Sequence, residues 1–261
     1  MAIAFVQYDD YYNSSYVTTI ANNTALNTTT GNFLVVTVAN YQGVVGEGVV
    51  TGITDTAGNT YVKAIGGYRN EGSSGERCEI WYAEDITGNA NNITTATYED
   101  DAAYNLISVS EYSGVATSSS LLDTSFNSRS STTSHYSGTA TSTSTGDLII
   151  GVYKGVGSET ITLGSGFSTL SSDLTFVLAM VEYKILGASG NYQANCTTST
   201  TQSSLMQCAI FAVAAAVGTN MKINIGDVWK DVDSMKINIG DTWKDVVEVK
   251  QNIGDVWKVV Y

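Results

Sequence analysis

The sequence predicts an all-β protein: an antiparallel two-sheet sandwich of jelly-roll type, built from two similar halves and followed by a meander of repeated β-hairpins. Three observations lead to this prediction. Short runs of alternating apolar and polar residues, bounded by Gly, Asn, Asp and Ser, recur through residues 1–217. No window longer than a few residues combines a 3.6-residue period with helix-capping signals. Residues 219–261 repeat with a period of 14.

The alternating runs are the expected strands. Strands this numerous and this closely spaced predict two packed antiparallel sheets, because each sheet must bury one apolar face. In chain order, the runs are Ile3–Tyr8, Tyr16–Ile20, Phe33–Tyr41, Val49–Asp55, Tyr61–Ile65, Glu79–Glu84, Ile93–Tyr98, Tyr104–Tyr112, His135–Thr141, Leu148–Lys154, Phe176–Ile185, Tyr192–Thr197 and Leu205–Ala215.

The first 217 residues also contain an internal repeat of two similar segments. The segment starting at Thr28, Thr-Thr-Thr-Gly-Asn-Phe-Leu-Val-Val-Thr-Val, returns from Thr143 as Thr-Ser-Thr-Gly-Asp-Leu-Ile-Ile-Gly-Val-Tyr. A Gly-rich turn, a short strand and two long strands follow each copy. We therefore expect two half-units, about 1–115 and 135–217, whose apolar faces close on each other. The Ser/Thr-rich segment Ser113–Ser134 is the expected connection between them.

Each copy of this internal repeat contains a glycine followed by Asn or Asp, just before a central strand. Gly31 and Gly146 are expected to adopt positive φ at this turn, because glycine has no Cβ to oppose it.

Composition changes sharply after Val217. Six of the nine lysines and three of the four tryptophans lie in residues 221–261. Three near-identical copies begin at Met221, Met235 and Val249, each containing the motif Gly-Asp-x-Trp-Lys. Such regularity predicts a repeated supersecondary unit.

The spacing within a copy predicts a hairpin. Gly-Asp at 226–227 suits a two-residue turn, which would pair Ile225 with Val228 and place Asn224 opposite Trp229. A second two-residue turn would join each copy to the next, giving a continuous six-stranded meander. Its apolar face cannot remain in water, so it must close into a prism, pack on the sandwich or pair with other subunits. The expected assembly or binding residues are Trp229, Trp243, Trp257, Ile223, Ile225, Ile237, Ile239 and Ile253.

Charge excludes some classes of partner. The formal net charge is −13, which opposes binding to nucleic acids and to anionic membranes. No apolar run approaches the roughly 20 residues of a membrane-spanning helix. A polar surface built from Thr, Ser, Asn and Gly is typical of extracellular and virion β-proteins. The first residues, however, have the pattern of a strand and not that of an export signal. A virion protein assembled in the host cytoplasm reconciles these features, and so does a cell-surface protein whose signal has been removed.

Residues suited to catalysis or metal binding are few. The single histidine, His135, lies in a Ser/Thr-rich stretch and is expected to be solvated and without a catalytic role. Glu99-Asp100-Asp101 and Asp55–Asn59 could offer oxygen ligands to calcium, but side-chain turn chemistry explains both segments without metal. We therefore expect no catalytic residues, no metal and no cofactor.

The three cysteines leave two alternatives open. Cys196 and Cys208 would face each other if the last two predicted strands formed a hairpin, leaving Cys78 over. An odd cysteine count without an export signal favours buried thiols over a disulfide.

Three motifs carry a resemblance to a known family. The segments Thr54–Ala64, Ile80–Gly88 and Val109–Val115 resemble a jelly-roll or immunoglobulin-like β-sandwich module of phage virion and bacterial surface proteins. The Gly-Asp-x-Trp-Lys copies are similar to short Trp-containing repeats at the ends of phage tail and virion proteins. This resemblance implies a sandwich fold over about residues 1–217 and brings no catalytic residues with it.

Together these observations predict a non-enzymatic structural protein of a bacteriophage virion, in a tail fibre or as a head decoration. Its repeats would bind other virion proteins or further copies of the chain, with a trimer as one form for a fibre. The alternative is an extracellular glycan-binding or adhesin module that presents Tyr or Trp surfaces, such as Tyr11-Tyr12, to host glycans.

Overall fold

The computed structural model describes residues 2–42, 48–71, 74–156, 160–173 and 178–215, together with six strand segments at 222–225, 228–231, 236–239, 242–245, 250–253 and 256–259. The chain divides into two units. One is Ala2–Ala214, and the other is Ala215–Tyr261 with Met1. Every regular element in the described part of the chain is a β-strand, as the alternating sequence pattern predicts.

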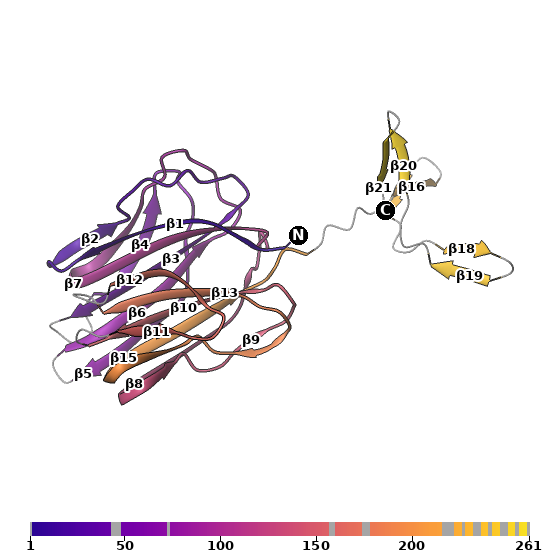
Figure 1. Ribbon diagram of the computed structural model, residues 1–261. Coiled ribbons are helices and arrows are strands. Elements are labelled where there is room, and N and C mark those ends of the chain that lie inside the picture. The colour runs from indigo at the N-terminus through magenta and orange to yellow at the C-terminus, as the bar shows by residue number, and fades with distance from the viewer. Residues whose placement is uncertain are drawn as a thin grey trace. The chain divides into compact units, whose positions relative to one another are not determined.

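The first large sheet is formed by the amino-terminal half of the sandwich (Figure 1). Its strand order is β1 (Ala4–Asn13), β7 (Thr94–Ser113), β3 (Phe33–Gln42), β6 (Ser74–Ala83) and β5 (Val62–Glu71). The 20-residue strand β7 continues beyond this sheet. Its first part pairs with two shorter strands, β2 (Val17–Ala21) and β4 (Val50–Asp55), which cover the outer face.

The second large sheet repeats this order. It runs β8 (Leu121–Tyr136), β15 (Asn195–Phe211), β10 (Leu148–Gly155), β13 (Ala179–Ile185) and β12 (Ser168–Asp173). The first part of β15 also pairs with β11 (Ile161–Leu163), and β9 (Ala140–Ser142) pairs with β14 (Gly190–Tyr192). Strands β1, β7, β3, β6 and β5 thus correspond in order to β8, β15, β10, β13 and β12.

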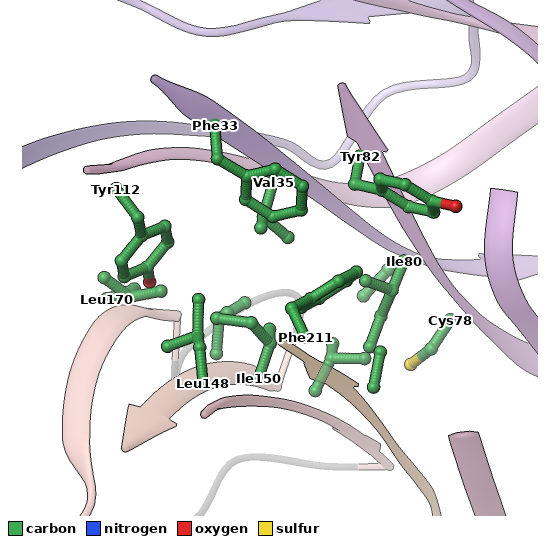
Figure 2. Packing of buried hydrophobic residues seen from close by; sticks show 14 of the residues in the cluster. Phe33, Val35, Cys78, Ile80, Tyr82, Tyr112, Leu148, Ile150, Leu170 and Phe211 are labelled. Carbon is green, nitrogen blue, oxygen red and sulfur yellow. The ribbon is translucent and has the colours of Figure 1, made fainter. Parts of the chain in front are cut away.

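The two sheets pack face to face around one aromatic core (Figure 2). The Phe211 ring centroid lies 4.9 Å from that of Phe33 and 5.2 Å from that of Tyr82. Leu148 and Ile150 of the second sheet join the same cluster. Strand β1 lies against β12, and β5 lies against β8, so corresponding edges meet in the same way on both sides. The fold is therefore an all-β, two-sheet sandwich.

Each large sheet also has a smaller core on its outer face. Leu34 and Val36 of β3 pack under β2 and β4, whereas Ile149 and Tyr153 of β10 pack under the layer that contains β9 and β11. Because β3 and β10 are buried on both faces, their sequences are nearly continuous apolar runs and not alternating ones.

The two glycines of the internal repeat adopt the predicted positive φ. Gly31 has φ +85° and Gly146 has φ +94°. The Gly31 N–H donates to the Ile86 carbonyl, and the Gly146 N–H donates to the Leu186 carbonyl. The same turn therefore begins the central strand of both sheets.

The segment Ser113–Ser134, the expected connection between the halves, contains a strand that its sequence does not predict. Most of it belongs to β8, which pairs with β15 along the edge of the second sheet. An edge strand keeps one side in solvent, so it needs few apolar residues. Its Ser/Thr-rich sequence consequently shows no apolar alternation.

The repeats form three hairpins with one shared register. In the first hairpin, β16 (Lys222–Ile225) pairs with β17 (Val228–Asp231), with Ile225 opposite Val228 and Asn224 opposite Trp229 as predicted. Strands β18 (Lys236–Ile239) with β19 (Thr242–Asp245), and β20 (Lys250–Ile253) with β21 (Val256–Val259), pair in the same way. Among the described strands these are three separate two-stranded sheets, so the continuous six-stranded meander is not found.

The inner core predicts a large difference between two phenylalanines. Phe211 is fully buried between the sheets, whereas Phe126 on β8 is 54% exposed. Phe211→Ala should lower the free energy of unfolding by about 3–5 kcal/mol, because it leaves a cavity in the shared core. Phe126→Ala should change it by less than about 0.5 kcal/mol. Urea unfolding of both variants measures this, and equal effects would contradict a core shared by both sheets.

Candidate functional site

The predicted assembly residues occupy equivalent backbone positions in the three hairpins. Trp229, Trp243 and Trp257 each lie opposite an asparagine. Ile225, Ile239 and Ile253 each lie next to the turn, and Ile223 and Ile237 each lie opposite a lysine. The surroundings of these side chains lie outside the part of the chain that the structure describes. Their assembly role therefore stays a prediction.

The motif around Asp55 has a structural role. Asp55 Oδ1 accepts a hydrogen bond from the Asn59 N–H at 2.9 Å, and Oδ2 accepts from the Tyr61 hydroxyl at 2.9 Å and from Asn92 Nδ2 at 3.1 Å. Burial alone would raise the pKa of Asp55, but hydrogen bonds from Asn59, Asn92 and Tyr61 outweigh it and lower the pKa. Asp55 therefore holds a turn together, as the side-chain turn interpretation predicts.

The motif around Glu111 acts in the same way. Glu111 is fully buried, and its Oε1 accepts hydrogen bonds from the Thr29 N–H at 2.8 Å and from Asn32 Nδ2 at 2.6 Å. Three residues later, Gly114 has φ +75°, and a Cβ there would clash with the Ala2 carbonyl oxygen. These motif residues therefore hold turns and strand ends of the sandwich in place.

A fully buried glutamate joins three strands of the first half. Glu79 Oε2 lies 2.7 Å from Lys63 Nζ and accepts a hydrogen bond from Trp81 Nε1 at 3.0 Å. Its Oε1 accepts from the Val50 N–H at 3.1 Å. Lys63 Nζ also lies 4.8 Å from the centre of the Trp81 ring. Both carboxylate oxygens are thus occupied by groups from β4, β5 and β6, and the cluster is structural.

The prediction that His135 is solvated is wrong. The side chain is fully buried at the end of β8, with Nδ1 2.7 Å from Ser204 Oγ and Nε2 3.0 Å from Thr198 Oγ1. Its ring centroid lies 5.0 Å from that of Tyr153. Burial, with a smaller contribution from the positive charge of Arg129, lowers the pKa of His135 to about 4. Ser204 is buried too, so this serine–histidine pair is closed to a substrate.

Glu182 is a buried acid whose pKa is shifted, as the pKa of His135 is. It is fully buried on the outer side of β13, where Oε1 accepts a hydrogen bond from the Asn195 N–H at 2.9 Å. Its Oε2 has no hydrogen-bond partner among the described residues. Burial raises the pKa of Glu182 to about 8, against hydrogen bonds from the backbone of Asn195 and Gly164 and the charge of Lys184. The carboxyl group is therefore largely protonated at neutral pH.

All three cysteines are buried and free. Cys196 and Cys208 belong to one continuous strand, β15, so the hairpin that would have made them face each other does not form. Burial raises the pKa of Cys78 and of Cys196, which keeps these thiols protonated and unreactive. Buried thiols are the alternative that the odd cysteine count favours.

Two hollows in the surface differ in the side chains that line them. One, of about 550 Å³, is lined by Tyr16, Thr18 and the acidic run 99–101. The described residues contain no group of three or more His, Cys, Asp or Glu side chains arranged to hold a metal ion. The other hollow, of about 480 Å³, lies over the second sheet and is lined by amides, hydroxyls, two aromatic rings and a lysine. No sequence motif indicates it, because its residues are scattered over 139–195.

No family model, curated protein or solved structure gives a significant match to the chain. In the described part of the chain, no helix has the length and apolar character needed to cross a bilayer.

His135 predicts a loss of stability in acid. Its pKa is about 4 in the folded protein and about 6.5 when unfolded, so protons bind the unfolded chain first as the pH falls. Its contribution is complete above pH 6.5 and is lost progressively down to pH 4. His135→Gln should remove this part of the acid sensitivity, by roughly 1–3 kcal/mol between pH 7 and 4. Unfolding titrations with parallel pH profiles for both proteins would contradict a neutral, buried imidazole.

Glu182 predicts the opposite dependence. Its folded pKa of about 8 lies above the unfolded value of 4.5, so the unfolded chain releases its proton first as the pH rises. The associated stability is complete below pH 4.5 and is lost towards pH 8. Glu182→Gln should therefore unfold at higher urea than the wild type at pH 8, and at similar urea at pH 4.5. Glu99→Gln, at an exposed position, is the matched control and should show no such pH-dependent gain.

Proposed function

We propose that the protein is a non-enzymatic structural component of a bacteriophage virion, displayed on a tail fibre or on the head, and that its three carboxyl-terminal hairpins bind neighbouring subunits. The observation that carries this proposal is the threefold repetition of one hairpin with one register. Repetition of an identical backbone unit supplies identical contacts to identical or regularly spaced partners.

The size of the hairpins supports a role in association. Each consists of two strands of four residues. An isolated two-stranded hairpin is at best marginally stable in water, because it has little apolar surface to bury and its outer backbone edges lack strand partners. Each copy would gain stability by pairing or packing with a further element, which other virion proteins or further copies of this chain can provide.

The sandwich suits display on a particle surface. In its first half, the buried side chains of Glu79 and Glu111 connect strands and turns through hydrogen bonds. The setting in a virion rests on the resemblance of the three sandwich motifs and of the repeats to phage structural proteins. The acidic, Ser/Thr/Asn-rich surface agrees with exposure outside the cell.

A glycan-binding or adhesin function is the second candidate. The observation that favours it is the exposure of four tyrosines on and just after β1: Tyr8, Tyr11, Tyr12 and Tyr16 are 40–62% exposed. Exposed aromatic rings on one strand are suited to stacking on sugars.

Removal of the repeats tests the first proposal. Deletion of residues 219–261 leaves the compact unit Ala2–Ala214 and should convert an assembled protein to a monomer. Sedimentation of the full-length and truncated proteins measures this, and incorporation into purified particles measures it in the natural setting.

Point variants distinguish a role of the tryptophans from the effect of shortening the chain. The triple variant Trp229→Ala, Trp243→Ala, Trp257→Ala should weaken assembly about as much as the deletion does, since the three positions are equivalent. Tyr12→Ala, which removes an exposed ring from the sandwich, is the control and should leave assembly unchanged. If the truncated protein sediments and enters particles as the intact chain does, the proposal is wrong.

A further inference from the structure

A polar groove lies over the outer face of the second sheet. It occupies about 480 Å³ between the β9–β14 pair and the residues that precede β12. Phe167, Lys184 and the segment 191–195 supply most of its lining. This volume is within the range of about 300–1,000 Å³ that is usual for small-molecule sites.

The groove presents hydrogen-bonding groups that the protein itself does not use. Asn191 Oδ1 accepts from the Thr141 hydroxyl at 3.1 Å, which orients the amide but leaves its Nδ2 donors unused by any described residue. Gln193 Nε2 donates to Thr139 Oγ1 at 3.2 Å, and Asn195 Nδ2 donates to the Gln193 carbonyl at 3.2 Å. Within the described chain, nothing donates to the amide oxygens of Gln193 and Asn195. Oriented donors and acceptors of this kind match the vicinal hydroxyls of a sugar.

Aromatic rings complete the polar lining. Phe167 and Tyr192 are each half-buried, so each ring is anchored in the protein and still reaches the groove. The Tyr192 hydroxyl donates to the Ala188 carbonyl at 2.8 Å, which fixes the plane of the ring. Rings held in this way offer apolar faces to the C–H groups of a sugar, while the amides serve its hydroxyls.

The charge of the groove differs from that of the whole protein. The chain carries a net charge of −13, yet the described groove residues include the cation Lys184 and no carboxylate. Lys184 Nζ donates to the Ser165 carbonyl at 3.1 Å and lies 5.5 Å from the centre of the Phe167 ring. The nearest acid along β13, Glu182, is largely protonated at neutral pH because burial raises its pKa to about 8. The ammonium group is therefore left to attract an anionic ligand group.

The groove is held in shape before any ligand binds. Asn191 pairs with Thr141 and Tyr192 pairs with Ala140 in the β9–β14 ladder. The backbone of Asn195 is fixed from below by Glu182. A site that is already ordered loses little conformational entropy on binding, which favours affinity.

We propose that this groove binds a saccharide that carries a carboxylate group, as uronic and sialic acids do. The sugar ring packs against Phe167 and Tyr192, its hydroxyls hydrogen-bond to Asn191, Gln193 and Asn195, and its carboxylate pairs with Lys184. This site lies wholly within the unit Ala2–Ala214. It stands independently of the proposed assembly role of the hairpins, because residues 219–261 contribute nothing to its lining.

Calorimetric titration of the full-length protein tests the site with two matched pairs of probes. One pair is tetragalacturonate and its fully methyl-esterified form, and the other is sialyllactose and lactose. We expect at least one acidic probe to bind about tenfold or more tightly than its neutral match, as for a hydrogen bond to a charged group. The preference should weaken as salt is added.

Three variants assign the binding to the groove. Lys184→Met should abolish the preference for the acidic probe, whereas Asn191→Ala should weaken binding of the acidic and neutral probes about equally. Phe126→Ala, which removes an exposed ring of β8 outside the groove lining, is the control and should bind as the wild type does. The proposal is overturned if neither acidic probe binds, if the neutral forms bind equally well, or if Lys184→Met changes nothing. Loss of binding in Phe126→Ala would also overturn it, by placing the site outside the groove.

Discussion

Two apolar sheet faces that must cover each other determine this structure. Phe33, Tyr82 and Phe211 meet between the sheets, and neither sheet can bury its share of that cluster without the other. The two sheets repeat one strand order, and β1 meets β12 at one edge of the shared core as β8 meets β5 at the other. Burial of this kind is the main favourable contribution to folding, and it requires both halves to fold together.

The second constraint is the burial of polar groups by the outer layers. Once short strands cover the outer faces of the sheets, every carboxylate there needs donors or must lose its charge. Glu79 and Glu111 have such donors, since each accepts hydrogen bonds from both main-chain and side-chain groups. Glu182 is instead largely protonated at neutral pH, and His135 likewise remains neutral between Ser204 and Thr198.

The sequence predicts those parts of the structure that depend on local chemistry. Strands β3 and β10 are recognisable as apolar runs, Gly31 and Gly146 as positive-φ turns, and the hairpin register follows from turn length alone. Features that depend on distant partners are missed. Strand β8 is held by backbone pairing to β15, and His135 is buried by residues more than 60 positions away, so neither leaves a local pattern. The groove is missed for the same reason, since β9, β13 and β14 come together only in the folded chain.

The hairpins differ from the rest of the molecule in that nothing within four-residue strands can bury an apolar face alone. We therefore expect the six strands β16–β21 to become stable through contact with another subunit. Amide hydrogen exchange, followed strand by strand at low and high protein concentration, measures this most directly. We expect β16–β21 to exchange rapidly in the dilute protein and to become protected as it assembles, while the sandwich stays protected throughout. Full protection of the hairpins in a dilute monomer would contradict it.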